Sequence, residues 1–126
     1  MRVVDTSAFV ERFADTPMRN QIDPLLPADE DWLVPTIVQF EVAKWLLRSS
    51  YPRPIRLARS IVEPLQVVSL IPEIASAAAS IWDQYKLATA DAIIYATARV
   101  HGAELLTCDR HFEGLPDVIY LPKPPN

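Results

Sequence analysis

The chain alternates short apolar runs with longer amphipathic stretches. The apolar runs cover residues 2–4, 32–34, 66–70, 105–108 and 118–121, and their β-branched and leucine content predicts short buried strands. Apolar residues recur at helical spacing in the intervening stretches, which predicts helices over about 8–13, 17–26, 35–48, 53–63, 72–85 and 89–101. Because strands alternate with helices, we expect parallel pairing and a three-layer α/β/α sandwich around a short-stranded parallel sheet.

Capping residues and prolines mark where these predicted helices begin and end. Ser7 is expected to cap the first helix, Thr16 and Pro17 to open the second, and Gly102 to close the last in a left-handed conformation. No segment has the repetition or bias of a repeat or low-complexity region. We therefore expect residues 1–126 to form a single domain, a size that suits one core.

Composition narrows the class of protein. The chain lacks an apolar stretch long enough for a signal peptide or a membrane span, so we expect a cytoplasmic protein without a membrane partner. Cys108 is the only cysteine, which excludes an internal disulfide and a cysteine zinc cluster. The net charge of −4 argues mildly against binding nucleic acid by bulk positive charge.

Four acidic residues occupy positions where their charge needs an explanation. Asp5 and Asp109 directly follow predicted strands, Asp91 lies in the first turn of a helix, and Glu41 lies on an apolar row inside another helix. Each has a structural interpretation by itself. The two aspartates after strands can form turns, Asp91 can complement the helix dipole and so favour its own ionised form, and Glu41 can pair with a cation on its own helix.

Taken together, the four acids predict a metal site. In a parallel α/β sheet the ligand lies beyond the carboxyl ends of the strands, where Asp5 and Asp109 are placed and where a helix amino end can bring a third acid. Converging carboxylates repel one another unless cations neutralise them, and ligands that are all oxygen favour Mg²⁺ or Mn²⁺. Such ions suit the hydrolysis of phosphate esters.

The stretches that contain these acids resemble a known family. "VVDTSAFVE", the helical glutamate of "VPTIVQFEVAKWL", "LATADAIIYATA" and "LLTCDRHF" are similar to the successive acidic motifs of the PIN-domain family. The chain length, the motif order and the "DTSAFVE" opening resemble the VapC-type ribonuclease toxins of VapBC toxin–antitoxin modules. The resemblance spans residues 2 to about 121, and four motifs in order are fairly specific.

The resemblance implies a PIN-like fold and a Mg²⁺- or Mn²⁺-dependent endoribonuclease that cuts structured RNA of the tRNA or ribosomal RNA class. It also implies silencing by a cognate antitoxin protein and assembly as a homodimer. The matching metal-binding and catalytic residues are Asp5, Glu41, Asp91 and Asp109. Thr6, Ser7 and Thr107 match polar positions beside the acids, where a hydroxyl can orient a carboxylate.

Positive charge is concentrated in one part of the chain. Residues 42–59 contain no acid, and their five cations are candidates for binding RNA phosphate or, equally, form a solvated helix face. Arg110, next to Asp109, is a further candidate. The candidate RNA-binding residues are thus Lys44, Arg48, Arg53, Arg56, Arg59 and Arg110.

Other activities fit the sequence less well. Cys108 with His101 or His111 would suggest nucleophilic catalysis, but a lone cysteine on an apolar strand usually packs as a small hydrophobic residue. Thr6 and Ser7 follow Asp5, which disfavours receiver domains and haloacid-dehalogenase-type phosphatases because both need another acid there. A catalytically silent PIN-like module that binds RNA or a protein stays an alternative.

Overall fold

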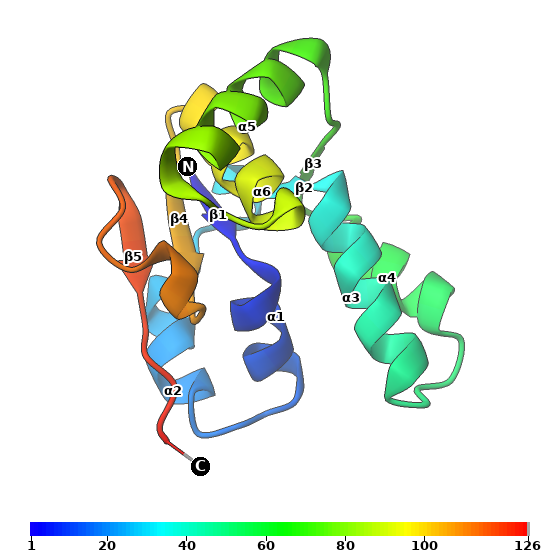
Figure 1. Ribbon diagram of the computed structural model, residues 1–126. Helices are drawn as coiled ribbons and strands as arrows, with labels where there is room; N and C mark the ends of the chain where they lie inside the picture. The colour runs from blue at the N-terminus through cyan, green and yellow to red at the C-terminus, as the bar shows by residue number, and fades with distance from the viewer. Residues whose placement is uncertain (126) are drawn as a thin grey trace.

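A single sheet of five parallel strands forms the centre of the computed structural model, which describes residues 1–125 (Figure 1). The strand order is β3-β2-β1-β4-β5. Register is set by pairs such as Val3 with Leu33 and Val4 with Leu106. The strands are β1 (Arg2–Val4), β2 (Trp32–Pro35), β3 (Gln66–Val68), β4 (Glu104–Thr107) and β5 (Val118–Tyr120).

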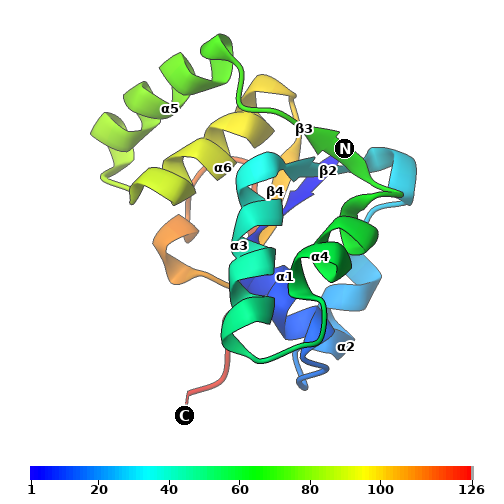
Figure 2. The ribbon, with the colours of Figure 1, turned by 90° about the vertical axis from the view of Figure 1, so that its right-hand side faces the viewer.

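Helices cover both faces of this sheet, which confirms the predicted three-layer α/β/α sandwich. Figure 2 shows α5 and α6 on one side of the sheet and α1, α2 and α4 on the other. The helices are α1 (Thr6–Phe13), α2 (Arg19–Ile22), α3 (Thr36–Arg48), α4 (Pro54–Val62), α5 (Pro72–Tyr85) and α6 (Thr89–Val100). Among residues 1–125, no helix combines the length and the apolar character that crossing a membrane requires.

The hydrophobic core lies on both faces of the sheet, against α6 on one face and against α1 and α4 on the other. Both faces of the central strands are covered, so their side chains are buried without alternation, as in Val3, Val4, Leu105 and Leu106. The helix α6 packs against β1, β2 and β4 on one side and against α5 on the other. It therefore buries six residues, including Tyr95, whose hydroxyl donates to the Pro116 carbonyl at 2.6 Å. This packing fixes the amino end of α6 relative to the sheet.

Two local predictions differ from the structure. Ser7 is not the cap of the first helix, because α1 begins at Thr6 and the Ser7 side chain is used elsewhere. The predicted helix over 17–26 is only the short α2, followed by a 3-10 helix over Asp23–Leu25. Pro24 lacks the N–H that an α-helix needs there, which explains the break. Gly102 has φ +63°, as the predicted left-handed cap requires.

The sheet topology identifies the edge at which a ligand would bind. From β1 the order runs to β2 and β3 on one side and to β4 and β5 on the other. Such a switch in direction leaves a crevice beyond the carboxyl ends of the two strands concerned. The Asp5 N–H continues the ladder by donating to the Leu106 carbonyl at 2.8 Å, which holds the end of β1 beside the end of β4.

Candidate active site

Asp5 is a buried carboxylate at the end of the central strand, with only 3% of its surface exposed. Its Oδ2 accepts hydrogen bonds from the Ser7 hydroxyl at 2.7 Å and the Thr107 hydroxyl at 2.8 Å. Burial raises the pKa of Asp5, and the charge of Asp109 acts in the same direction, whereas these hydrogen bonds oppose the rise. The two hydrogen bonds therefore hold the Asp5 carboxylate in one orientation, while its burial disfavours the ionised form.

The two hydroxyl groups beside Asp5 are themselves oriented by backbone amides. The Cys108 N–H donates to the Ser7 oxygen at 3.0 Å, and the Asp109 N–H donates to the Thr107 oxygen at 2.9 Å. Because each hydroxyl accepts from an amide, its own proton is available for Asp5. The side chain of Ser7 thus joins α1 to the end of β4 and does not cap the helix.

Glu41 approaches from the helix α3. It is partly buried, and its Oε1 accepts a hydrogen bond of 2.7 Å from the hydroxyl of Thr6, the first residue of α1. The cation pairing that Glu41 could make on its own helix is absent from residues 1–125. The threonine instead holds this carboxylate toward the carboxyl edge of the sheet.

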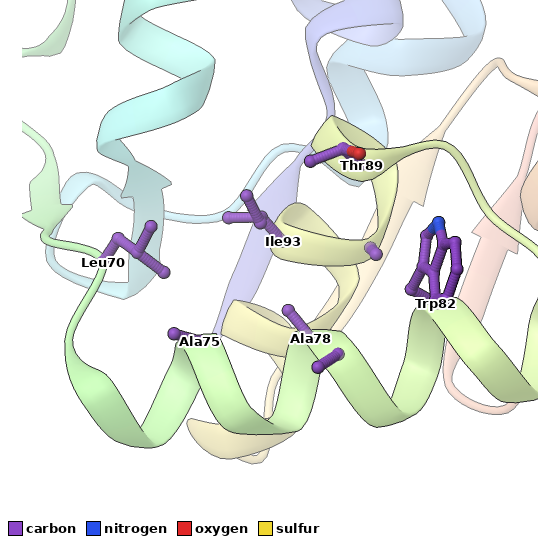
Figure 3. Close-up of a pocket in the computed structure, with 8 residues that line it drawn as sticks. Leu70, Ala75, Ala78, Trp82, Thr89 and Ile93 are labelled. Carbon is purple, nitrogen blue, oxygen red and sulfur yellow. The ribbon is translucent and has the colours of Figure 1, made fainter.

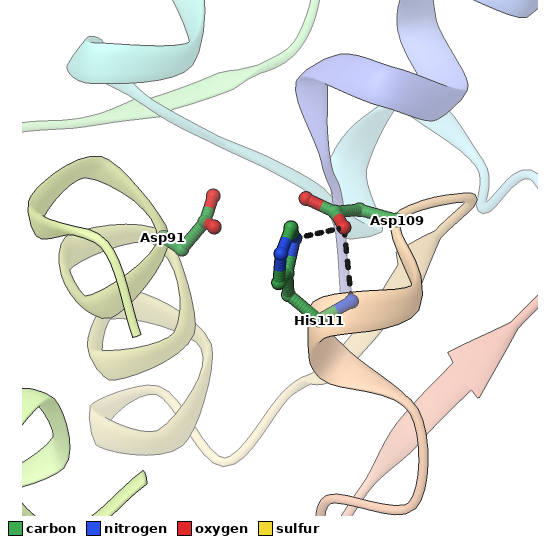
Figure 4. A group of neighbouring side chains, drawn as sticks. All are labelled: Asp91, Asp109 and His111. Atoms are coloured by element: carbon green, nitrogen blue, oxygen red, sulfur yellow. Dashed lines mark hydrogen bonds and ion pairs between the residues drawn. The ribbon is translucent and has the colours of Figure 1, made fainter. Parts of the chain in front are cut away.

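Asp91, Asp109 and His111 form the open part of the cluster. Figure 4 shows Asp91 projecting from the first turn of α6 toward the other two side chains. One possible ligand atom from each of the three lies within 4.8 Å of those of the others. Asp109 Oδ1 accepts from the backbone N–H of His111 at 2.9 Å and lies 2.7 Å from the ring Nδ1. A divalent cation could be held between these groups.

The ionisation of Asp91 reflects its surroundings. Partial burial raises the pKa of Asp91 to about 6, and the negative charges of Asp5, Asp109 and Glu41 contribute to the rise. These effects outweigh the helix dipole, which by itself would favour the ionised form. The charges of the other three acids therefore reach Asp91, although all four are far apart in the sequence. Among the described residues, the group whose ligand atoms lie within 4.8 Å of one another contains Asp91, Asp109 and His111, and not Asp5 or Glu41.

Positive charge does not neutralise this cluster. Among residues 1–125, no lysine or arginine forms an ion pair with any of the four acids; His111 with Asp109 is the one pairing, and it needs a protonated ring. The predicted RNA-binding cations of the 42–59 stretch lie on α3, α4 and the loop between them. Arg110 is exposed, in the 3-10 helix Arg110–Phe112 that follows Asp109.

His111 is the residue that sequence reasoning underestimates. The sequence suggests it as a partner for Cys108 or, with Arg110, as a contact to substrate phosphate, and a surface turn is an equal interpretation of these two residues. The spacing of two residues between Asp109 and His111 is the signal that could have identified it, because a 3-10 turn after Asp109 brings His111 back beside the Asp109 carboxylate. Cys108 itself is buried, which raises the pKa of its thiol to about 11 and leaves it un-ionised at neutral pH. The structure gives nucleophilic catalysis by Cys108 no support.

A second hollow lies between α5 and α6 and has a different character (Figure 3). Its volume is about 290 Å³, and it contains no titratable side chain. It is therefore a place for apolar packing and not for acid–base or metal chemistry. The lining residues are Leu70, Ala75, Ala78, Ala79, Trp82, Thr89, Ala92 and Ile93.

Comparisons with known proteins agree with this fold. The family described as PIN domain matches residues 2–118. No curated protein sequence matches the chain. A similar solved structure is a toxin–antitoxin complex from Klebsiella pneumoniae, with a TM-score of 0.81 and 24% identity over 94% of this chain and 96% of that chain.

Two further solved structures have the same fold. FitAcB from Neisseria gonorrhoeae has a TM-score of 0.78 and 22% identity, over 97% of this chain and 98% of that chain. VapC20 from Mycobacterium tuberculosis, described as a sarcin-ricin loop cleaving toxin, has a TM-score of 0.71 and 18% identity, over 91% of this chain and 92% of that chain.

Proposed function

Because the chain belongs to the PIN-domain family, we propose that it is a metal-dependent endoribonuclease and the toxin of a type II toxin–antitoxin pair. Its reaction is the hydrolysis of phosphodiester bonds in structured RNA of the tRNA or ribosomal RNA class. The observation that carries the proposal is the approach of four carboxylates from four segments of the chain: partial burial, and then the charges of Asp5, Asp109 and Glu41, raise the pKa of Asp91. Structures of similar fold that are described as toxins or toxin–antitoxin complexes support it.

The donor atoms of the site fit Mg²⁺ or Mn²⁺. Asp5, Glu41, Asp91 and Asp109 offer carboxylate oxygens, which both ions prefer, and the His111 ring is a donor that Mn²⁺ also accepts. A divalent ion held by these residues would supply an activated water and neutralise charge on the phosphate. A bound cation would also relieve the repulsion among the four acids.

The residues of the chain supply orientation. Ser7 and Thr107 fix Asp5 by two hydrogen bonds, and Thr6 fixes Glu41 by one. The acids are then positioned before any ligand arrives, so binding requires little rearrangement. Asp91, with a pKa of about 6, is mostly ionised at neutral pH and available to a cation.

The proposed partners are RNA, a cognate antitoxin and a second copy of the chain. The basic stretch on α3 and α4 lies next in sequence to Glu41, and its arginines at the start of α4 are exposed and suited to binding phosphate. The apolar hollow between α5 and α6, with Trp82 exposed by 53%, supports the expected homodimer because large exposed apolar groups usually mark an interface.

Cleavage of RNA by the purified chain tests the activity. Protein freed of any partner is incubated with an RNA pool and Mg²⁺ or Mn²⁺, and cleavage should stop with a chelator or with Asp5→Asn. Asp31→Asn is the matched control, because Asp31 is exposed and outside the cluster. Cleavage that survives both the chelator and Asp5→Asn would point to a contaminating nuclease.

A silent module would give a different result. The wild-type chain would then bind RNA or a protein without cutting RNA under either metal. The toxin assignment has its own test, which is whether the adjacent upstream reading frame encodes a small protein with a DNA-binding amino end. Co-expression of that protein should suppress the cleavage measured with the free chain.

A further inference from the structure

A hollow of about 450 Å³ opens against the acid cluster on the side of β4 and β5. These two strands are parallel neighbours, with Thr107 paired to Tyr120. The chain leaves their carboxyl ends in different directions, into a 3-10 helix after β4 and into an extended tail after β5, and the hollow lies between them. Its lining residues are Ser7, Cys108, Asp109, Arg110, His111, Tyr120 and Lys123.

This hollow carries positive charge beside an acidic site. Arg110 and Lys123 are exposed, and neither forms an ion pair within the described residues 1–125. Lys123 and Cys108 both line the hollow. The one carboxylate in the lining, Asp109, is already bonded to His111. The two cations are thus free for an external anion.

We propose that this hollow binds the phosphodiester group next to the one that is cleaved, so that Lys123 and Arg110 are substrate-binding residues. The inference rests on the proposed nuclease function, and it gives the segment after β5 a role in that function. An RNA strand extends on both sides of the cut. Arginine suits a phosphate through paired N–H donors, and lysine suits it as a mobile point charge.

The position of the hollow supports a continuous path for the strand. The sheet order places β5 at one edge, whereas β2 and β3, and with them α3 and α4, lie toward the other. In Figure 1 the α3–α4 pair and β5 likewise lie on opposite sides of α1. The acid cluster between them would then have a basic surface on each side, one from α3 and α4 and one from the hollow.

Binding of a short, fluorescently labelled, single-stranded RNA of random sequence tests the proposal. Fluorescence anisotropy is measured with Mg²⁺ in an Asp5→Asn background, which separates binding from cleavage. Lys123→Gln and Arg110→Gln should each weaken the affinity by roughly fivefold, and each should lower the slope of log affinity against log salt by about 0.7 if one phosphate is no longer neutralised. The matched control is Lys86→Gln, an exposed lysine at the end of α5.

The possible results separate this inference from the proposed function. Cleavage is measured with the same substitutions made singly in the wild-type chain. If the wild type cleaves RNA but both substitutions leave binding and cleavage unchanged, the hollow is not a subsite and the nuclease proposal stands. If Lys86→Gln weakens binding as much as Lys123→Gln, only bulk charge is involved and the inference is overturned. A rise in KM with unchanged kcat in the single variants would support it. Absence of cleavage by wild type under either metal would overturn the nuclease function itself.

Discussion

Asp91 is a residue whose charge is unfavourable for the metal-free fold and, in the proposed site, favourable for binding a cation. Its pKa is raised to about 6 by partial burial and by the charges of the neighbouring acids. In the unfolded chain the same group ionises at its ordinary value near 3.8. Between these two values the folded state binds more protons, so stability falls as the pH rises through this window, and the penalty stays constant above it.

Asp91→Asn should therefore stabilise the metal-free protein at pH 7. We expect a gain of about 1 kcal/mol, because solvent screening of a half-buried group reduces the full effect of a pKa shift of about two units. The decrease in stability between about pH 4 and pH 6 should also become smaller. Urea denaturation across this pH range measures both, with Asp31→Asn as a control that should leave the profile unchanged.

Divalent cations supply a second readout for Asp91. A cation that binds only the folded state raises its stability, so Mg²⁺ or Mn²⁺ should stabilise the wild type more than Asp91→Asn. An asparagine variant that gains as much from the cation as the wild type would remove Asp91 from the metal site. If Asp91→Asn and the wild type were equally stable at pH 7 without metal, the charge of Asp91 would not destabilise the fold and the prediction would be wrong.

Thr107 is the residue whose replacement should be most costly near the site. Thr107→Val keeps the volume but removes the donor to Asp5 and the acceptor of the Asp109 N–H in a fully buried place. We expect a decrease of about 2 kcal/mol in the free energy of unfolding, because a charged group loses a hydrogen bond. Chemical denaturation measures it. Thr107→Ser, which keeps the hydroxyl, should restore most of it; equal decreases in both variants would show that packing alone is responsible.

At the scale of elements, the α3–α4 pair carries the predicted RNA-binding cations. Its arginines on and before α4 are exposed and unpaired among residues 1–125. Replacement of Arg53, Arg56 and Arg59 by glutamine should weaken RNA binding and reduce the salt slope by about 0.7 to 0.9 for each phosphate that is no longer neutralised. Binding titrations at several salt concentrations measure this. An unchanged slope would mean that these arginines form only a solvated surface.

Most of the element pattern could be predicted from the sequence, because strand and helix periodicities and the prolines are local signals. The four acids could also be named as candidates, since each stands in a recognisable motif after a strand or on a helix, and the charges of the other three reach Asp91 in the structure. Their role in a metal site stays a prediction. The use of Ser7 was not predictable, because its hydroxyl lies against Thr107, a residue distant in sequence, and only the register of β1 against β4 brings them together. The proximity of His111 to Asp109 was not predicted either, because it depends on the 3-10 turn that follows Asp109.

At the scale of the whole molecule, the apolar hollow between α5 and α6 is the surface on which we expect a second copy of the chain to pack. The hollow lies between α5 and α6, where Thr89 and Ile93 of α6 face Ala78 and Trp82 of α5 (Figure 3). Leu70, Ile71 and Trp82 around it are all exposed by 44% or more. A second copy of the chain that covers this surface would remove these apolar groups from water.

Trp82→Lys should therefore dissociate the expected homodimer. A tryptophan at the centre of an interface commonly contributes about 2 kcal/mol or more, so the dimer should weaken by roughly thirtyfold or more. Sedimentation velocity over a range of protein concentrations measures the change. Phe13→Lys is the matched control, because Phe13 is also exposed but lies on α1. A wild-type chain that is monomeric throughout would contradict the homodimer, and a variant dimer as tight as the wild type would place the interface elsewhere.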